Sequence, residues 1–296
     1  DEYVRNMIGE ALLRPEIAER KKKLVFMYAQ VLWNLRAFEE CKKVLESYVE
    51  EKKGLLQLFY EIICCYDELL PNCEEQKGEI PVYGEKERTG EEKVHFATVY
   101  KKLKKTYINP DTYNLRFLAE YEDRDSQHVA YYWLGVAAGQ LFHEHRDAVE
   151  YLMRAYEVKP TLAACEELAK NYLAIAEEKT RYDKNAKVYQ VDMNALLKAR
   201  IRFQYIMNTS DKTARHSIYR QSGLDYLRTL HLLRDYRAFE EEYQKIHDDI
   251  PEEQNYPLKM LKAENDACYE HTVTDEVLNG LKEEDKEYVR YVCVVN

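Results

Sequence analysis

The chain has 296 residues, 46% of them hydrophobic and 33% charged, which is enough to bury a large core in one or two domains. Its formal net charge of −10 does not suit nucleic-acid binding, which requires lysine and arginine to replace the counterions of phosphate. No apolar run approaches the length of about 18 residues that a membrane span needs, so we expect no membrane partner.

Glycine and proline are both scarce, at nine and seven residues. Typical proteins contain about 7% glycine and about 5% proline. Few turns can therefore require a left-handed backbone, and few hairpins are expected. Together with helical spacing of apolar residues along the chain, this composition predicts an all-α fold.

The cysteine content indicates a reducing compartment. The seven cysteines are an odd number, contain no CxxC pair, and lie mostly inside apolar helical runs. We interpret them as reduced thiols in a cytoplasmic protein. The chain begins at Asp1 without a methionine, which suggests a segment excised from a longer polypeptide.

The first part of the chain is predicted to hold helices up to one long loop. Residues 1–20 contain a short helix broken near Pro15, residues 21–49 a helical pair, and residues 55–70 a helix that is apolar nearly all round and therefore buried. Residues 71–92 concentrate glycine, proline and mixed charge. We expect this stretch to be a mobile loop.

Two further helices are predicted after the loop, at 91–107 and 112–121. The sequence Asn-Pro-Asp at 109–111 separates them as a turn and cap. The first of these helices contains the basic run 101–105, which we interpret as a solvated helix face.

Residues 131–172 carry a spaced pattern of small and apolar residues. The pattern is Tyr131-x2-Leu134-Gly135-x2-Ala138, then Ala148-x3-Leu152-x2-Ala155-x4-Pro160, then Cys165-x2-Leu168-Ala169-x2-Tyr172. Gly135 and Ala169 are 34 residues apart. This stretch resembles the tetratricopeptide repeat family, whose period is about 34 residues. A helical pair at 126–157 and the first helix of a second pair at 162–178 are therefore expected.

The resemblance implies an α-α superhelix, a right-handed solenoid of antiparallel helix pairs. Small residues at Gly135 and Ala169 would let paired helices approach closely, and Pro160 would stop the second helix. Gly135 and Ala148 are 13 residues apart where the family has 12. We therefore expect an extra residue in the turn near 143–146.

The remaining elements follow in chain order. They are an insertion at 179–191, a helix from about 192, a long helix at 211–236, its partner at 237–249, a helix at 256–271, and a last helix at 275–291 with an apolar tail. The letters Arg-Ala-Phe-Glu-Glu occur at 36–40 and at 237–241, each where a second helix of a pair should begin. We interpret them as internal repetition. The predicted organisation is N-terminal helical pairs at 1–70, the loop at 71–92, and repeats with C-terminal capping helices at 93–296, forming one continuous solenoid.

The sequence contains none of the common catalytic or cofactor-binding motifs. There is no glycine-rich phosphate loop, no HExxH and no GxSxG. His143 and His145 are two residues apart, so on a helix they would point about 200° apart and could not share a metal. We therefore expect no catalytic residue, no metal and no cofactor.

The predicted function is the binding of a protein or peptide in the concave surface. The resemblance implies that the first helix of each pair lines this surface, which by position singles out four candidate residues, Tyr132, Gln140, Glu166 and Lys170. Glu166 and Lys170 are also four apart and could pair with each other. The Asn and Arg/Lys clamp of chaperone-tail-binding members is not matched.

Two alternative functions stay open at this stage. One is an accessory helical region of a larger enzyme, such as a bacterial glycosyltransferase that carries such repeats after its catalytic domain. The other is an intracellular peptide-pheromone receptor, which would need a DNA-binding or effector-binding segment that is not visible here.

Overall fold

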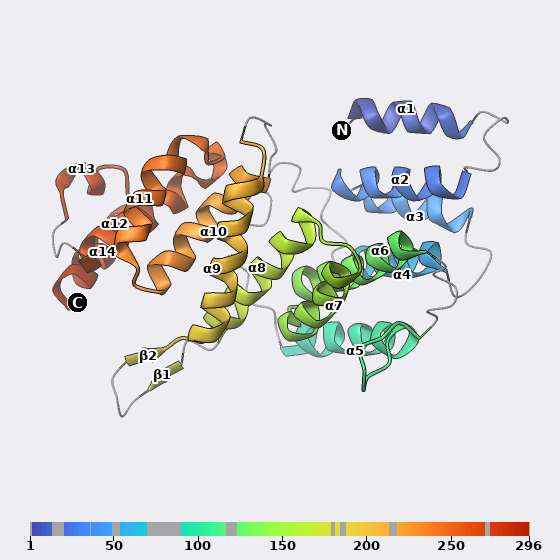
Figure 1. Ribbon diagram of the computed structural model, residues 1–296, viewed down its shortest axis with the longest axis horizontal. Coiled ribbons are helices and arrows are strands. Elements are labelled where there is room, and N and C mark those ends of the chain that lie inside the picture. Colours follow the sequence, from blue (N-terminus) through green and yellow to red (C-terminus); the bar gives the residue numbers. More distant parts are fainter. Residues whose placement is uncertain are drawn as a thin grey trace. The chain divides into compact units, whose positions relative to one another are not determined.

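The computed structural model describes residues 2–13, 21–35, 37–48, 54–69, 90–116, 123–178, 181–183, 188–212, 218–269 and 273–295 (Figure 1). Within these residues the regular elements are helices, apart from one two-stranded hairpin and one isolated bridge. The all-α prediction is thus confirmed. Contacts group the chain into two compact units, unit 1 (Asp1–Lys159) and unit 2 (Pro160–Asn296). Of the loop predicted at 71–92, residues 71–89 lie outside the described part of the chain.

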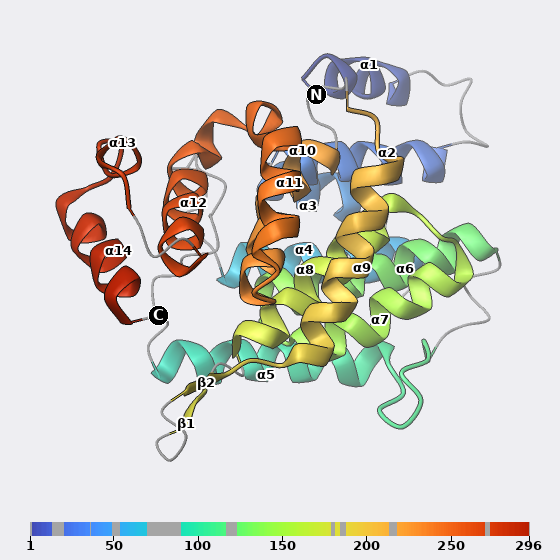
Figure 2. The ribbon, with the colours of Figure 1, turned by 60° about the vertical axis from the view of Figure 1, so that its left-hand side comes forward.

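Unit 1 contains seven α-helices among its described residues. They are α1 (Glu2–Leu12), α2 (Lys21–Asn34), α3 (Phe38–Glu46), α4 (Leu55–Leu69), α5 (Gly90–Tyr107), α6 (Arg124–Val136) and α7 (His145–Val158). Successive helices pack on one another from α1 to α4, and α4 packs on α5 and α6 (Figures 1 and 2). The predicted helices at 1–20, 21–49, 55–70 and 91–107 are confirmed where they are described.

Aromatic side chains fill the space between α2, α3, α4 and α6. The indole of Trp33 lies edge-on to Trp133 with ring centroids 4.5 Å apart, and to Tyr66 at 4.4 Å. Phe59 completes the group at 5.0 Å from Trp133. Edge-to-face pairs of this kind add about 0.5–1.5 kcal/mol each beyond their buried area. This cluster ties helices that are 100 residues apart in the sequence into one core.

Unit 2 continues the helical packing. Its α-helices are α8 (Leu162–Glu178), α9 (Met193–Thr209), α10 (Ile218–Leu232), α11 (Tyr236–Ile246), α12 (Asn255–Tyr269), α13 (Asp275–Leu278) and α14 (Glu283–Val295). Helix α10 packs on α8, α9, α11 and α12, and α12 packs on α14. Two 3₁₀ turns, His247–Asp249 and Glu252–Gln254, join α11 to α12.

The insertion predicted at 179–191 contains a small hairpin. Strand β1 (Arg181–Asp183) pairs antiparallel with β2 (Val188–Gln190), with Tyr182 opposite Tyr189. The following helix begins where it was predicted, because the Asp192 side chain accepts a hydrogen bond from the Ala195 N–H at 3.1 Å and caps α9.

The helix predicted at 112–121 is wrong for residues 112–116. Tyr113 has a φ of +57°, which ends a helix, and Leu115 forms an isolated antiparallel bridge with Ile108. The Arg116 Nε–H donates to the Ile108 carbonyl at 2.8 Å. The segment therefore folds back on the end of α5, and residues 117–121 lie outside the described part of the chain.

Two helices predicted in unit 2 are shorter than expected. The helix predicted at 211–236 is α10, which ends where Arg234 takes a φ of +58° and the Asp235 N–H reaches the Leu230 carbonyl at 3.0 Å. This is a Schellman-type end in which arginine takes the place that glycine usually holds. The last helix is split into α13 and α14 by a turn at 279–282.

The extra residue expected near 143–146 is accommodated inside the preceding helix. Helix α6 passes directly into a π-helical turn at Ala137–Leu141, in which the Phe142 N–H donates to the Ala137 carbonyl at 3.1 Å, five residues back. A π turn takes up one residue more than an α turn. His143 then ends the helix with a φ of +57°.

Helices α6 and α7 approach each other closely at Gly135. A Cβ atom added at Gly135 would lie 2.5 Å from the Leu152 Cγ and 3.3 Å from the Ala148 carbonyl oxygen. The pair α6 and α7 can therefore pack at this distance only because position 135 has no side chain. Ala169, the equivalent small residue of α8, is fully buried.

Candidate binding surface

The four predicted binding residues fall into two groups. Tyr132 lies on α6 and Gln140 in the π turn, both in unit 1, whereas Glu166 and Lys170 lie on α8 in unit 2. Gln140 is exposed and Tyr132 is partly buried. The Tyr132 ring stacks on His128 with centroids 6.2 Å apart and lies edge-on to Trp133 at 5.6 Å. Tyr132 is thus held by neighbours on its own helix.

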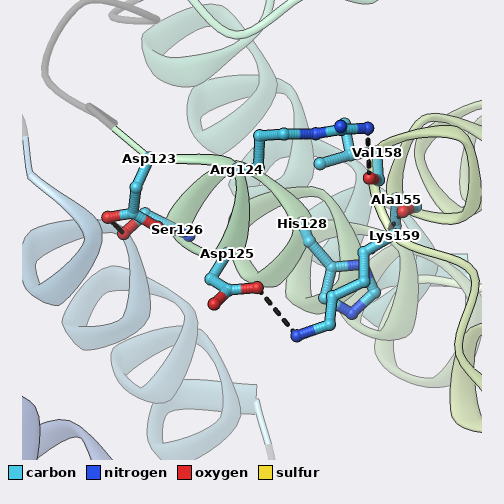
Figure 3. Close-up of polar contacts among 8 residues, drawn as sticks. All are labelled: Asp123, Arg124, Asp125, Ser126, His128, Ala155, Val158 and Lys159. Carbon is cyan, nitrogen blue, oxygen red and sulfur yellow. Dashed lines mark hydrogen bonds and ion pairs between the residues drawn. The ribbon is translucent and has the colours of Figure 1, made fainter.

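His128 belongs to a set of polar contacts between the start of α6 and the end of α7 (Figure 3). Its Nδ1 lies 2.9 Å from the Ala155 carbonyl oxygen and therefore carries the hydrogen of that bond. Arg124 donates to the Val158 carbonyl at 2.8 Å, and Lys159 pairs with Asp125 at 2.7 Å. These contacts satisfy carbonyls at the end of α7 and fix the pair. They leave His128 as a structural residue.

Glu166 and Lys170 form an ion pair inside the fold. The Glu166 Oε1 lies 2.8 Å from the Lys170 Nζ, and the two side chains expose 8% and 19% of their area. The Glu167 carboxylate lies 3.6 Å from the same Nζ. The Ser222 hydroxyl of α10 reaches Glu166 at 3.4 Å. The pairing alternative predicted for these two residues is therefore the one found.

A second ion pair continues this polar region along α8 and α10. The Arg228 Nε lies 2.6 Å from the Glu177 Oε1. The Arg228 side chain is 45% exposed and the Glu177 side chain 31%, so this pair can be reached from solvent. Asp225 lies between the two pairs, since it interacts electrostatically with both Lys170 and Arg228.

We call this region the polar seam. It consists of Glu166, Glu167, Lys170 and Glu177 on α8, Ser222, Asp225 and Arg228 on α10, and Glu264 on α12. Five carboxylates face two cations in the seam, so its formal charge is −3 when all these groups are ionised.

The raised pKa values of the seam carboxylates reflect chiefly their burial. Burial raises the pKa of Asp225, and Lys170 and Arg228 only partly oppose the shift. Burial likewise raises the pKa of Glu177 and of Glu264, in both cases against the effect of Arg228. Burial alone would lower the pKa of Lys170, but its surrounding carboxylates raise it well above its usual value. Lys170 is therefore firmly cationic, whereas the carboxylates lack sufficient positive charge.

A histidine lies beside the Glu264 end of the seam. The Nε2 of His231 on α10 is 4.0 Å from the Glu264 Oε2. Burial lowers the pKa of His231, so near neutral pH the imidazole is uncharged and does not neutralise Glu264.

The arrangement is suited to electrostatic recognition. A buried carboxylate without full compensation is stabilised by any cation that reaches it. Among the described residues no group of three histidine, cysteine or acidic side chains could hold a metal ion.

Half of the six seam residues that sequence reasoning missed lie on α10. Arg228 follows the small residue Gly223 of α10 by five residues, just as Gln140 follows Gly135. Applying the same five-residue spacing to α10, the opening helix of the next pair, would have singled out Arg228. Asp225 and Ser222 have no such counterpart in the predicted set, and only the packing of α8 on α10 brings them to Glu166 and Lys170.

A second polar cluster lies on α5 and α7 in unit 1. Asp147 accepts hydrogen bonds from the Tyr100 hydroxyl at 2.7 Å, the Lys104 ammonium at 2.6 Å and the Tyr113 hydroxyl at 2.9 Å. Lys104 was expected on a solvated helix face, and this expectation is wrong because Asp147 draws it onto α7. With three donors on one carboxylate, the cluster serves to dock α5 and the 108–116 turn.

The cysteines give no sign of redox chemistry in the part of the chain that is described. Its six cysteines are free thiols. Burial raises the pKa of Cys41 to about 12 and raises that of Cys165, so both stay protonated and unreactive.

No family model matches the chain, and comparisons with curated proteins and with solved structures find no match. None of the described helices is both long and apolar enough to cross a membrane.

Proposed function

We propose that this chain is a helical-repeat protein of the tetratricopeptide type that binds an extended protein or peptide segment along the first helices of its pairs. In support, the helices α8, α10 and α12 each open a pair, and α10 contacts both of the others. Their partners α9, α11 and α14 each pack on the helix that opens the pair. Stacking of this kind generates the extended surface on which solenoid proteins bind their ligands.

The observation that supports this proposal best is the polar seam, because it lies on these opening helices and holds a surplus of carboxylates. Charged side chains on ordinary repeat surfaces are solvated and paired in equal numbers. Here burial raises the pKa of Asp225 and Glu177, in each case against the opposing effect of nearby cations. A partner lysine or arginine would supply the missing charge.

The exposed end of the seam defines where such a partner would enter. Arg228 and Glu177 are reachable from solvent, while Glu166 and Lys170 lie further along α8 and are less exposed. A partner guanidinium could form a bidentate contact with Glu177 and displace Arg228 toward Glu264. The proposed ligand is therefore a peptide with at least one basic side chain.

Binding of labelled peptides tests the proposal directly. Unstructured peptides that carry arginine at fixed positions, and matched peptides with glutamine at the same positions, are titrated by fluorescence anisotropy. We expect the arginine peptide to bind at least tenfold more tightly, which corresponds to about 1.4 kcal/mol. The double variant Glu177→Gln and Asp225→Asn should abolish this preference.

A control variant separates the seam from the general acidity of the chain. Glu241→Gln and Asp248→Asn remove the same number of charges from exposed positions outside the seam. The control should retain the full preference for the arginine peptide. Equal losses in both double variants would mean that the peptide responds only to net charge, and the seam would then not be the binding site.

A further inference from the structure

Helix α9 exposes a continuous apolar stripe. Met193, Leu197, Ile201 and Tyr205 are 51%, 48%, 65% and 48% exposed, and they follow one another at intervals of four residues. Residues four apart lie on the same face of a helix, and this stripe extends over about 18 Å of its length. The opposite face of α9 is the one buried in unit 2, through Leu196, Ala199, Phe203 and Ile206. A contiguous exposed stripe of this kind marks a contact surface.

The charged residues of α9 itself are all positive. Helix α9 contains Lys198, Arg200 and Arg202 and has no acidic residue, although the whole chain has a net charge of −10. Lys198 and Arg202 are held at one edge over the ring of Tyr172, at 5.3 and 4.9 Å from its centroid. Arg200 is held at the other edge by Asp235 at 2.8 Å. The partner of this surface should therefore be apolar and acidic.

Helix α14 of the same unit has that composition. Its exposed face carries Tyr288, Tyr291 and Val294, which are 50%, 64% and 85% exposed. The exposed carboxylates Glu284 and Glu287 lie on the same face, one turn or less from these side chains, and the exposed Arg290 borders this face one turn from Val294. The α14 face thus carries more negative than positive charge. The other face of α14 packs on α12, where Val289 is fully buried together with Ala263 and Ala267.

We propose that α14 of one copy of this chain docks on the α9 stripe of a second copy. Both faces are apolar, and the carboxylates of one meet the lysine and arginine of the other. Two α9 stripes brought together would instead oppose Lys198 and Arg202 of one copy to the same cations of the other. The charge pattern thus selects the mixed contact over a symmetric contact between identical surfaces.

The geometry makes the contact head to tail. Helices α9 and α14 lie well apart within unit 2 in both views (Figures 1 and 2), so α14 does not cover the stripe of its own copy. A contact between two different surfaces leaves one of each free at the ends of an open assembly, and neither free in a closed ring. The chain should therefore form a concentration-dependent series or a closed ring. This inference does not depend on the polar seam or on its ligand.

Two blocking variants of the full chain test the proposal. Leu197→Glu with Ile201→Glu blocks the stripe, and Tyr291→Lys with Val294→Lys blocks the α14 face. Analytical ultracentrifugation should show wild-type assemblies above the monomer mass of 35.3 kDa and each variant alone as a monomer. An equimolar mixture should form a dimer and nothing larger, because it offers one intact surface of each kind. Val94→Glu, an equally drastic change at a 68% exposed position in unit 1, should assemble as wild type does.

Other outcomes would overturn the proposal in recognisable ways. If the α14 variant still assembled while the α9 variant did not, the stripe would pair with itself. A lowered melting temperature of the dilute α9 variant would mean that the stripe is covered within the chain. Sedimentation of wild type, but not of the α9 variant, with phosphatidylserine vesicles and without self-association would assign the stripe to a membrane surface. A wild-type chain that stays monomeric at every concentration would also refute it.

Discussion

The contact between Gly135 and Leu152 allows a sharp test of the register that organises unit 1. We consider the smallest possible change, Gly135→Ala. In a helix interior alanine is favoured over glycine by about 0.5–1 kcal/mol, so on helix propensity alone the variant should be more stable. The new methyl would lie 2.5 Å from the Leu152 Cγ, however, and Leu152 is fully buried.

The steric effect should outweigh the gain in propensity. Overpacking a well-packed core costs about 1–3 kcal/mol. The carbonyl oxygen of Ala148 lies on the same side at 3.3 Å, so the helices must separate or Leu152 must leave its rotamer. We expect a net loss of about 1–2 kcal/mol in the free energy of unfolding of unit 1. Gly135→Leu should lower the free energy of unfolding further, because its side chain is larger.

Urea unfolding followed by circular dichroism measures this loss. If the two units unfold separately, only the transition of unit 1 should move, and that of unit 2 serves as an internal reference. The matched control is Gly223→Ala in α10, where the added Cβ would meet Ile250 at an ordinary 3.4 Å. That variant should gain up to about 0.5–1 kcal/mol.

A double-mutant cycle identifies the cause. Leu152→Ala alone should cost about 2–5 kcal/mol by leaving a cavity. In that background Gly135→Ala should become neutral or stabilising, which gives a coupling energy of about 0.5–3 kcal/mol. If Gly135→Ala stabilised the wild-type chain as Gly223→Ala does, the close approach of α6 and α7 and the reasoning built on it would be refuted.

Three further predictions concern the polar clusters and the helix content. Lys170→Met should lower the stability of unit 2 by about 3 kcal/mol, because it leaves buried carboxylates uncompensated, and adding Glu166→Gln should recover part of the loss in thermal melts. The raised pKa of Asp225 means that the folded state binds a proton more tightly than the unfolded one. Its contribution to stability is thus present below about pH 4 and is lost as the pH rises through the raised value, so thermal melts from pH 4 to pH 7 should show a smaller loss of stability with rising pH in Asp225→Asn than in the wild-type chain. Far-ultraviolet circular dichroism should show more than half helix, against about 30–35% in typical proteins, and a strand-dominated spectrum would contradict the fold.

The helical elements could be predicted because their signals are local. Low glycine and proline content, apolar spacing and capping residues such as Asp192 act within a few residues, and the helices they indicate are found except at 112–116. The two copies of Arg-Ala-Phe-Glu-Glu show the limit of such signals. Both lie at the start of a second helix, but Phe38 is the first residue of α3, whereas Phe239 is the fourth residue of α11. The Asp235 cap starts the second helix earlier.

The errors arise where backbone geometry overrides composition. Tyr113, His143 and Arg234 adopt positive φ although none of them is glycine. A sequence in which glycine is scarce therefore predicts too few turns and helices that run too long. The π turn after Gly135 is similar, because the 13-residue spacing indicates one extra residue but not its position. It could lie in the turn or, as found, in the helix.

The candidate site illustrates a different limit. Family resemblance marks positions on a face, and it placed Glu166 and Lys170 on the opening helix of a pair. Whether such residues are solvated or buried depends on the helix that opens the next pair. Here that helix is α10, and its small residue Gly223 comes 54 residues after Ala169 of α8. The insertion with its hairpin lies between them, yet α10 still packs on α8 and covers Glu166. The long separation in sequence thus conceals a direct neighbour in space, and the surplus of carboxylates that makes the seam a candidate binding surface arises only when both helices are in place.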